Sequence, residues 1–183
     1  MASLKPSEHW VFAYGSLMWD PGFPVAESVG GRVDGYARSF CMTSVVFRGT
    51  IEAPGLVLAL DEKPGAHCQG LALRVESAHW DASYADLRAR ELATNAYHEL
   101  VLPICLGDGR VIEAITYVMR RDHAQYTGTL SLDEQARIIS RAVGGRGPNA
   151  DYLFNTADQL TRLGMQDADL DRLAHHVRDL MRG

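Results

Sequence analysis

Four apolar runs follow one another between His9 and Val75: WVFAY (10–14), RSFCMTSVVF (38–47), LVLAL (56–60) and QGLALRV (69–75). Turn-forming pieces such as DPGFP and EKPG separate these runs, which is the pattern of successive β-strands. A second apolar pair, 100–106 and 111–119, flanks Gly107-Asp108-Gly109, a strong hairpin signal. The sequence therefore predicts six or more strands.

Helical patterns follow the strands. Residues 81–93 (DASYADLRARELA) predict one helix, and the chain is helical in pattern beyond Leu130. Ser131 and Glu134 have the spacing of a capping box, so a helix is expected to begin there and to end at Gly144-Gly145.

Two further helices are expected near the end of the chain. One should begin with Asn149 as its N-cap and end at Gly164. The last has an apolar stripe at helical spacing: Leu170, Leu173, Val177 and Leu180. Strands followed by helices indicate an α+β fold, with helices packed on a mostly antiparallel sheet or small barrel.

Composition narrows the class of protein. The chain has 183 residues, 46% apolar and 22% charged, which predicts one globular domain spanning 1–183. Its net charge of -5 argues against a nucleic-acid partner. It has neither a membrane-length apolar run nor a signal-peptide pattern at its start, so a cytoplasmic location without membrane attachment is expected. Cys41, Cys68 and Cys105 are expected to be reduced thiols.

The common cofactor and metal motifs are missing from the sequence. The sequence contains no Walker A loop, no HExxH pair and no GxSxG turn. His175 and His176 would point about 100° apart on a helix, so they are not placed to bind one metal ion. No cofactor and no metal are expected.

One carboxylate, Glu91, falls on an apolar helix stripe. Trp80, Tyr84, Leu87 and Glu91 are spaced by four, three and four residues and therefore share one face. Burial there would raise the pKa of Glu91 toward neutrality and make it a useful proton shuttle. The alternative, which spacing does not separate from the first, is a structural ion pair with Arg88 or another arginine.

Two other segments are candidate binding elements. Residues 14–19 (YGSLMW) follow an apolar strand, and their amides, Gly15 and the Ser16 hydroxyl suit an anionic ligand. Arg48, beside Gly49 and Thr50, suits bidentate capture of a carboxylate. The structural alternative for residues 14–19 is an ordinary strand-to-turn junction. For Arg48 it is a surface turn.

A set of short motifs occurs in order along nearly the whole chain, from Val11 to about Leu173. They are FAYGSLMW with DPGF, GYARSF, FRGT, PGLVLAL, QGLALRV, the Arg90-Glu91 pair, AITYVM, QYTG and GPNADYLFNTADQL. Their order and spacing resemble the ChaC family of glutathione-specific γ-glutamylcyclotransferases. The chain departs from the family at Leu56, where an arginine is frequent, and at Asn95-Ala96, where many relatives have Gly-Gly.

The resemblance implies a γ-glutamylcyclotransferase-like barrel with flanking helices that splits glutathione into 5-oxoproline and cysteinylglycine without metal or cofactor. It implies that Glu91 is the catalytic general acid/base. The loop that binds the γ-glutamyl group in this family corresponds to Tyr14, Gly15, Ser16, Leu17, Met18 and Trp19. Arg48 and Tyr126 are further expected substrate contacts, and residues 121–128 are predicted to form a lid over the glycine end of the tripeptide.

Three alternatives stay open at this point. The same cyclisation could act on other γ-glutamyl peptides or amines, or the chain could be a non-catalytic barrel that binds a ligand and regulates a partner. A thiol hydrolase with a cysteine nucleophile and His67 or His79 as base is the least favoured, because the spacing provides no partner for the thiol. The oligomeric state is not predictable from these patterns.

Overall fold

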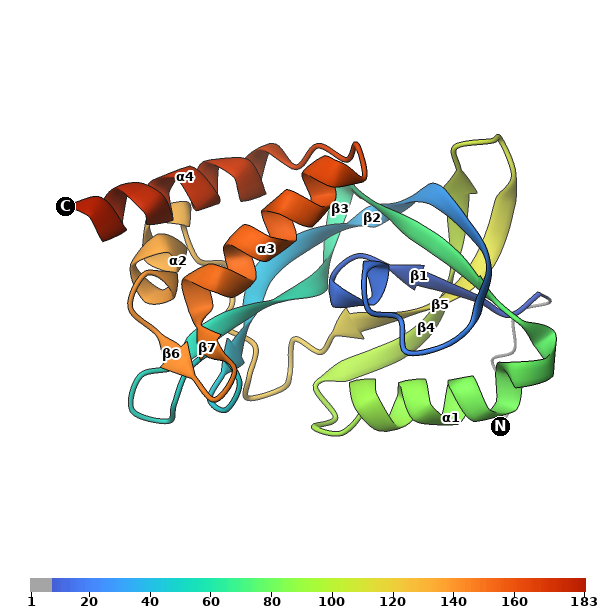
Figure 1. Ribbon diagram of the computed structural model, residues 1–183, viewed down its shortest axis with the longest axis horizontal. Helices are drawn as coiled ribbons and strands as arrows, with labels where there is room; N and C mark the ends of the chain where they lie inside the picture. Colours follow the sequence, from blue (N-terminus) through green and yellow to red (C-terminus); the bar gives the residue numbers. More distant parts are fainter. Residues whose placement is uncertain (1–7) are drawn as a thin grey trace. The chain divides into compact units, whose positions relative to one another are not determined.

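The computed structural model describes residues 8–183 as two compact units (Figure 1). The first comprises the chain up to Ser39 together with Ala59–His123, and the second comprises Phe40–Leu58 and Ala124–Gly183. Residues 1–7 lie outside the described residues. The prediction that the start of the chain is not a signal peptide falls partly on this segment. The single-domain assignment stays a prediction.

The strands close into a five-stranded barrel in the order β1-β3-β2-β4-β5. Their bounds are β1 Trp10–Ala13, β2 Val25–Ser44, β3 Gly55–Val75, β4 Tyr97–Leu106 and β5 Val111–Met119. β1 pairs antiparallel with β3, as β4 does with β2 and β5, whereas β5 runs parallel to β1 and β3. The predicted α+β fold with a mixed barrel is confirmed.

Two of the strands are longer than predicted. The runs 56–60 and 69–75, expected as separate strands, are parts of the single strand β3. Gly35 in β2 and Gly65 in β3 have φ of 86° and 82°, a conformation that bends a strand at a bulge. The turn-forming residues therefore bend these strands without ending them.

The hairpin prediction is confirmed at Gly107–Gly109. Leu106 N donates to Arg110 O at 2.8 Å, and Gly109 adopts φ of 92°, which glycine tolerates without strain. The first unit has its core inside these strands, with Trp10, Phe12, Leu60, Ile104 and Val118 among the buried side chains.

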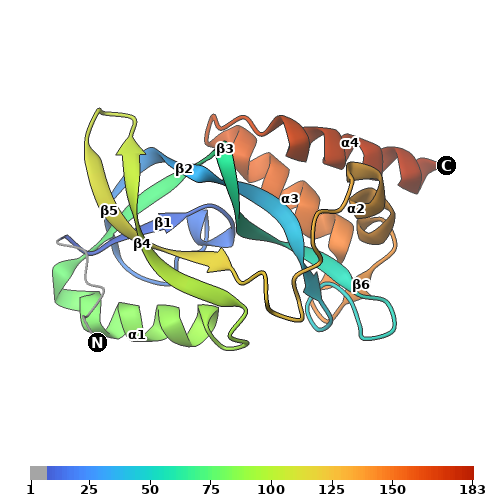
Figure 2. The same cartoon turned by 180° about the vertical axis from the view of Figure 1, so that it is seen from behind.

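Short helices complete the first unit. The 3₁₀ turn η1 (Ser16–Met18) follows β1, and η2 (Ser77–His79) leads into the helix α1 (Trp80–Glu91). Figures 1 and 2 both show α1 beside β4, in agreement with a hydrogen bond from the Tyr84 hydroxyl to Glu99 Oε1 at 2.8 Å. The predicted helix 81–93 is thus confirmed with slightly different ends.

The second unit contains the C-terminal helices. They are α2 (Leu132–Ile139), α3 (Asn149–Arg162) and α4 (Ala168–Arg182), and the small strands β6 (Val143–Gly144) and β7 (Gly147–Pro148) connect the first two. The Ser131–Glu134 capping box is present, with both reciprocal hydrogen bonds.

Two predicted helix boundaries were wrong. The first C-terminal helix ends at Ile139, because Gly144 forms a strand that packs closely on the chain at Gly49: a Cβ at Gly144 would lie 2.4 Å from Gly49 N. Asn149 is the first residue of α3 and not its N-cap. Its side chain instead bonds the backbone of Leu56, with Leu56 N donating to Oδ1 and Nδ2 donating to Leu56 O, both at 2.7 Å.

The apolar stripe of α4 is confirmed for three of its four members. Leu170, Leu173 and Val177 are buried, whereas Leu180 is 43% exposed near the end of the helix. Gly164 has φ of 69°, as expected for the residue that terminates α3. Among residues 8–183, no helix has the length and apolar character needed to cross a membrane.

Candidate active site

Glu91 is the last residue of α1, on the stripe that begins with Trp80. Trp80 and Leu87 are buried, and the Glu91 side chain is only 18% exposed. Burial raises the pKa of Glu91 above its ordinary value, and the nearby positive charge of Arg90 opposes part of that shift. The inward orientation expected from the spacing is therefore present.

Arg90 connects Glu91 to the loop after β1. Its Nε lies 3.3 Å from Glu91 Oε1, its Nη2 donates to Ser16 Oγ at 3.1 Å, and its Nη1 donates to Asp20 O at 3.0 Å. Glu91 is therefore both desolvated and ion-paired, and its role as a proton shuttle stays a prediction. Its partner is Arg90, whereas Arg88 pairs with Glu99 at 3.4 Å.

The loop itself is fixed by two buried side chains, Leu17 and Met18, each 8% exposed. The first amides of a helical turn have no acceptor within that turn, which leaves those at the start of η1 available to a ligand. Gly15 is itself buried, but a Cβ there would meet no atom within 4 Å. Ser16 is partly exposed.

The ends of the predicted loop are held differently. The Tyr14 hydroxyl donates to Tyr117 O at 2.8 Å, and Tyr14 O accepts from Arg38 Nε at 2.6 Å. Trp19 is half-buried and closes the 3₁₀ turn, with its amide donating to Ser16 O. Tyr14 therefore anchors the loop to the barrel of the first unit.

A second buried carboxylate, Glu99, lies between α1 and the β4–β5 hairpin. Tyr84 donates to its Oε1 at 2.8 Å and Tyr117 donates to its Oε2 at 3.0 Å, and the side chain is 9% exposed. The sequence analysis missed this cluster. A usable signal existed, because counting equal numbers of residues outward from the Gly107–Gly109 turn pairs Glu99 with Tyr117.

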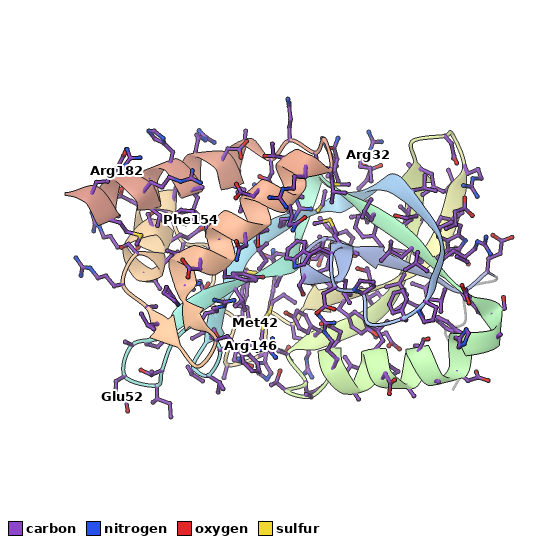
Figure 3. The ribbon with its side chains drawn as sticks, in the orientation of Figure 1. Arg32, Met42, Glu52, Arg146, Phe154 and Arg182 are labelled. Carbon is purple, nitrogen blue, oxygen red and sulfur yellow. The ribbon has the colours of Figure 1, made fainter. Side chains whose placement is uncertain are left out.

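Arg48 belongs to the second unit, where its guanidinium is bound by the protein itself. Nη1 donates to Arg146 O at 2.9 Å and to Pro148 O at 3.2 Å, and the group lies 5.5 Å from the centre of the Tyr152 ring. Arg146, labelled in Figure 3, in turn places its guanidinium 4.6 Å from the Phe47 ring.

Close backbone packing brings several of the quoted motifs together in this second unit. A Cβ at Gly55 would lie 2.1 Å from Arg48 O, and one at Gly49 would lie 2.1 Å from Gly55 N. Glycine is therefore required in both FRGT and PGLVLAL. The GPNADYL motif joins the same cluster through Asn149 and Tyr152, which bond the backbone of Leu56 and Leu58.

Tyr126 also lies in the second unit, where it forms an isolated β-bridge with Met42, a residue labelled in Figure 3. Thr43 N donates to Gln125 O at 2.8 Å, and Thr127 N donates to Cys41 O at 2.9 Å. A lid movement of residues 121–128 would have to break these bonds. The lid stays a prediction.

A separate polar cavity of about 440 Å³ is found in the first unit, lined by Glu8, His9, Glu27, Arg74, Ser77 and Arg110. None of the predicted site residues lines it. Glu27 forms ion pairs with both arginines of this cavity. Its Oε2 lies 3.1 Å from Arg74 Nε, and its Oε1 lies 2.5 Å from Arg110 Nη2.

The fold is a small mixed barrel. It carries a desolvated glutamate, Glu91, whose raised pKa suits proton transfer. A family described as ChaC-like protein matches residues 9–180. This match spans most of the sequence, and the chain belongs to that family.

Several characterised proteins are similar to the chain. The glutathione-specific gamma-glutamylcyclotransferase of Escherichia coli is 37% identical over 172 residues, covering 94% of this chain and 74% of that protein. Gamma-glutamylcyclotransferase 2-3 of Arabidopsis thaliana is 33% identical, covering 94% and 89%. A crystal structure of the yeast γ-glutamyl cyclotransferase specific to glutathione has the same fold, with a TM-score of 0.83, 22% identity and coverage of 93% and 96%.

Proposed function

We propose that this protein is a γ-glutamylcyclotransferase that cleaves glutathione into 5-oxoproline and cysteinylglycine. The observation that carries the proposal is the desolvated Glu91, joined through Arg90 to the Ser16 loop. The similarity to the glutathione-specific gamma-glutamylcyclotransferase of E. coli supports the choice of substrate.

The chemistry needs one group that both accepts and donates a proton. A γ-glutamyl group carries its own nucleophile, because its α-amine can attack its γ-carbonyl and close a five-membered lactam. Ionised Glu91 takes a proton from the α-ammonium, and the protonated acid then delivers it to the departing amide nitrogen as the C–N bond breaks. A pKa raised by burial suits both steps, since it brings proton gain and loss closer to neutral pH.

In this proposal the loop orients the γ-glutamyl end of the substrate. The amides of Gly15, Ser16 and Leu17 bind its α-carboxylate or stabilise the oxyanion that develops on the γ-carbonyl. Holding the flexible chain in a curled, near-attack arrangement provides much of the rate enhancement. Arg48 and Tyr126 are proposed as further contacts, with residues 121–128 covering the glycine end.

The departure from the family at Asn95-Ala96 falls in the turn that follows α1. Asn95 has φ of 56°, a left-handed conformation that asparagine tolerates better than most residues after glycine. The neighbouring Ala96 is fully buried. Asparagine therefore fits this left-handed position, which glycine would also adopt.

Product analysis tests the proposal. Purified protein incubated with glutathione should release equal amounts of 5-oxoproline and cysteinylglycine, and γ-glutamylalanine should be turned over more slowly. Faster release of 5-oxoproline from γ-glutamylalanine would reassign the substrate, and binding of glutathione with no product would favour a regulatory barrel. Alkylation of the thiols should leave the activity intact.

We also propose a cytoplasmic location. The cytoplasm is a reducing compartment, in which disulfides are rare. Glutathione is itself a thiol that such compartments keep reduced.

A further inference from the structure

The buried cluster around Glu99 has no part in the mechanism described so far. The Glu99 carboxylate contacts donor groups of two elements. Tyr84 and Arg88 are on α1, and Tyr117 is on β5. A buried carboxylate is costly unless donors compensate for the lost water, and here two hydroxyls and a guanidinium do so. The cluster is therefore a polar network in the first unit, with the half-exposed Arg88 at its margin.

The network holds the same helix face that carries Glu91. Tyr84 and Glu91 share one stripe of α1, and the Tyr84 ring stacks on Trp80 with a centroid distance of 4.9 Å. The Arg88 guanidinium covers the Tyr84 ring at 5.5 Å. Glu99 thus fixes α1 against the hairpin close to the helix end where Glu91 lies.

Tyr117 donates a hydrogen bond to Glu99, and the charges of both carboxylates act on its pKa. Burial, Glu99 and the charge of Glu91 all raise the pKa of Tyr117, so its phenol stays protonated at neutral pH. A phenol has one proton to donate, and the structure assigns it to Glu99 at 3.0 Å. Glu91 receives no hydrogen bond from it and has Arg90 as its charged partner.

We propose, on the basis of the proposed function, that Glu99 is a positioning residue for the reaction: it accepts hydrogen bonds from the Tyr84 and Tyr117 hydroxyls and pairs with Arg88, which keeps these donors away from Glu91. Without Glu99, the Tyr117 hydroxyl and the Arg88 guanidinium would become free to stabilise ionised Glu91. The charge of Glu99 would also be lost. Both changes favour the ionised form of Glu91.

The test is the acid limb of kcat/KM, the low-pH fall in rate that reports the essential base of the free enzyme. In Glu99→Gln the limb should move to lower pH by about 1 unit, and kcat at neutral pH should fall. Adding Tyr117→Phe to this variant should move the limb back toward the wild-type position, because the released donor is gone. A merely structural role would lower the amount of folded enzyme without moving the limb.

Tyr117→Phe alone is a second test that does not require removal of the buried carboxylate. If the Tyr117 hydroxyl donates its hydrogen bond to Glu99, the acid limb of kcat/KM should stay at its wild-type position. A limb moved to higher pH would mean that the phenol donates to Glu91, and that result would overturn the inference.

Glu113→Gln is the matched control, since Glu113 is an exposed carboxylate on the same strand as Tyr117 and should leave the limb unchanged. An active wild-type enzyme whose limb is unaffected by Glu99→Gln would overturn this inference alone. A wild-type protein that forms no 5-oxoproline would overturn the proposed function and the inference with it.

Discussion

Two carboxylates lie on either side of the contact between α1 and the β4–β5 hairpin, and they differ in their partners. Glu99 is 9% exposed and is bound by two tyrosine hydroxyls and an arginine. Glu91 is 18% exposed, is paired with Arg90, and has a raised pKa because burial outweighs that charge. The two carboxylates are therefore similarly buried but differ in the number of donors around them.

The difference shows that burial alone does not make a proton shuttle. A buried carboxylate with a full set of donors is held in place, whereas one with few donors exchanges its proton more readily near neutral pH. The charge of Glu91 acts on Tyr117, which is hydrogen-bonded to Glu99. Four changes test this comparison, and they follow in order of decreasing expected effect.

Glu91→Gln should reduce turnover of glutathione by about 100-fold or more, because general acid/base catalysis typically contributes 10²–10⁴-fold. Glu91→Asp should also lose about 100-fold, since its carboxylate falls short of the substrate by roughly one methylene. Rates of 5-oxoproline formation measure both, with thermal unfolding as a check on folding. Wild-type turnover by folded Glu91→Gln would remove Glu91 from the mechanism.

Glu99→Gln should destabilise the protein by about 1–3 kcal/mol at neutral pH, because the change leaves the hydroxyls of the buried Tyr117 and the half-buried Tyr84 with a poorer acceptor. The free energy of unfolding from urea titration measures this effect. Glu113→Gln, on the exposed side of β5, is the control and should change stability by less than about 0.5 kcal/mol. An equal effect of the two variants would mean that the network contributes nothing to stability.

Arg90→Met should lower kcat/KM by about tenfold or more, because the variant loses the hydrogen bonds to Ser16 and Asp20 that hold the loop next to Glu91. Arg32→Met is the control, since Arg32 forms an exposed pair with Asp34. Steady-state kinetics should separate the two variants. Unchanged kinetics in Arg90→Met would show that the loop needs no such bridge.

Glu91→Gln should raise the free energy of unfolding at neutral pH by about 1 kcal/mol, which is the scale of one pKa unit. The folded pKa of Glu91 is above its unfolded value, so its contribution to stability is fully present below the unfolded pKa and is lost as pH rises through the folded pKa. The advantage of Glu91→Gln should therefore disappear in acid. Thermal or urea unfolding across pH 3–8 measures it, and a constant difference would contradict a raised pKa.

Much of the fold was predictable because its signals are local. The hairpin at Gly107–Gly109 and the capping box at Ser131 depend on neighbours in the sequence. The break expected between 56–60 and 69–75 was wrong, because Gly65 bends the strand within its sheet. The inward position of Glu91 also followed from helical spacing.

The remaining features of the site depend on contacts between distant residues. The bond from Arg90 to Ser16 joins positions 74 residues apart, and helical periodicity does not predict it. The Tyr117 bond to Glu99 was accessible from the hairpin register, but the contribution of Tyr84 required knowing which face of α1 meets β4. Sequence patterns therefore singled out Glu91, whereas its partners depend on how α1 packs.

The pH dependence of kcat/KM for wild-type protein with glutathione, measured beside Glu91→Gln, tests the central claim most directly. The wild-type rate should fall on the acid side with an apparent pKa above that of an ordinary glutamate, and this limb should be missing from the residual activity of Glu91→Gln. A limb at or below the ordinary glutamate value, or the same limb in both proteins, would contradict the account.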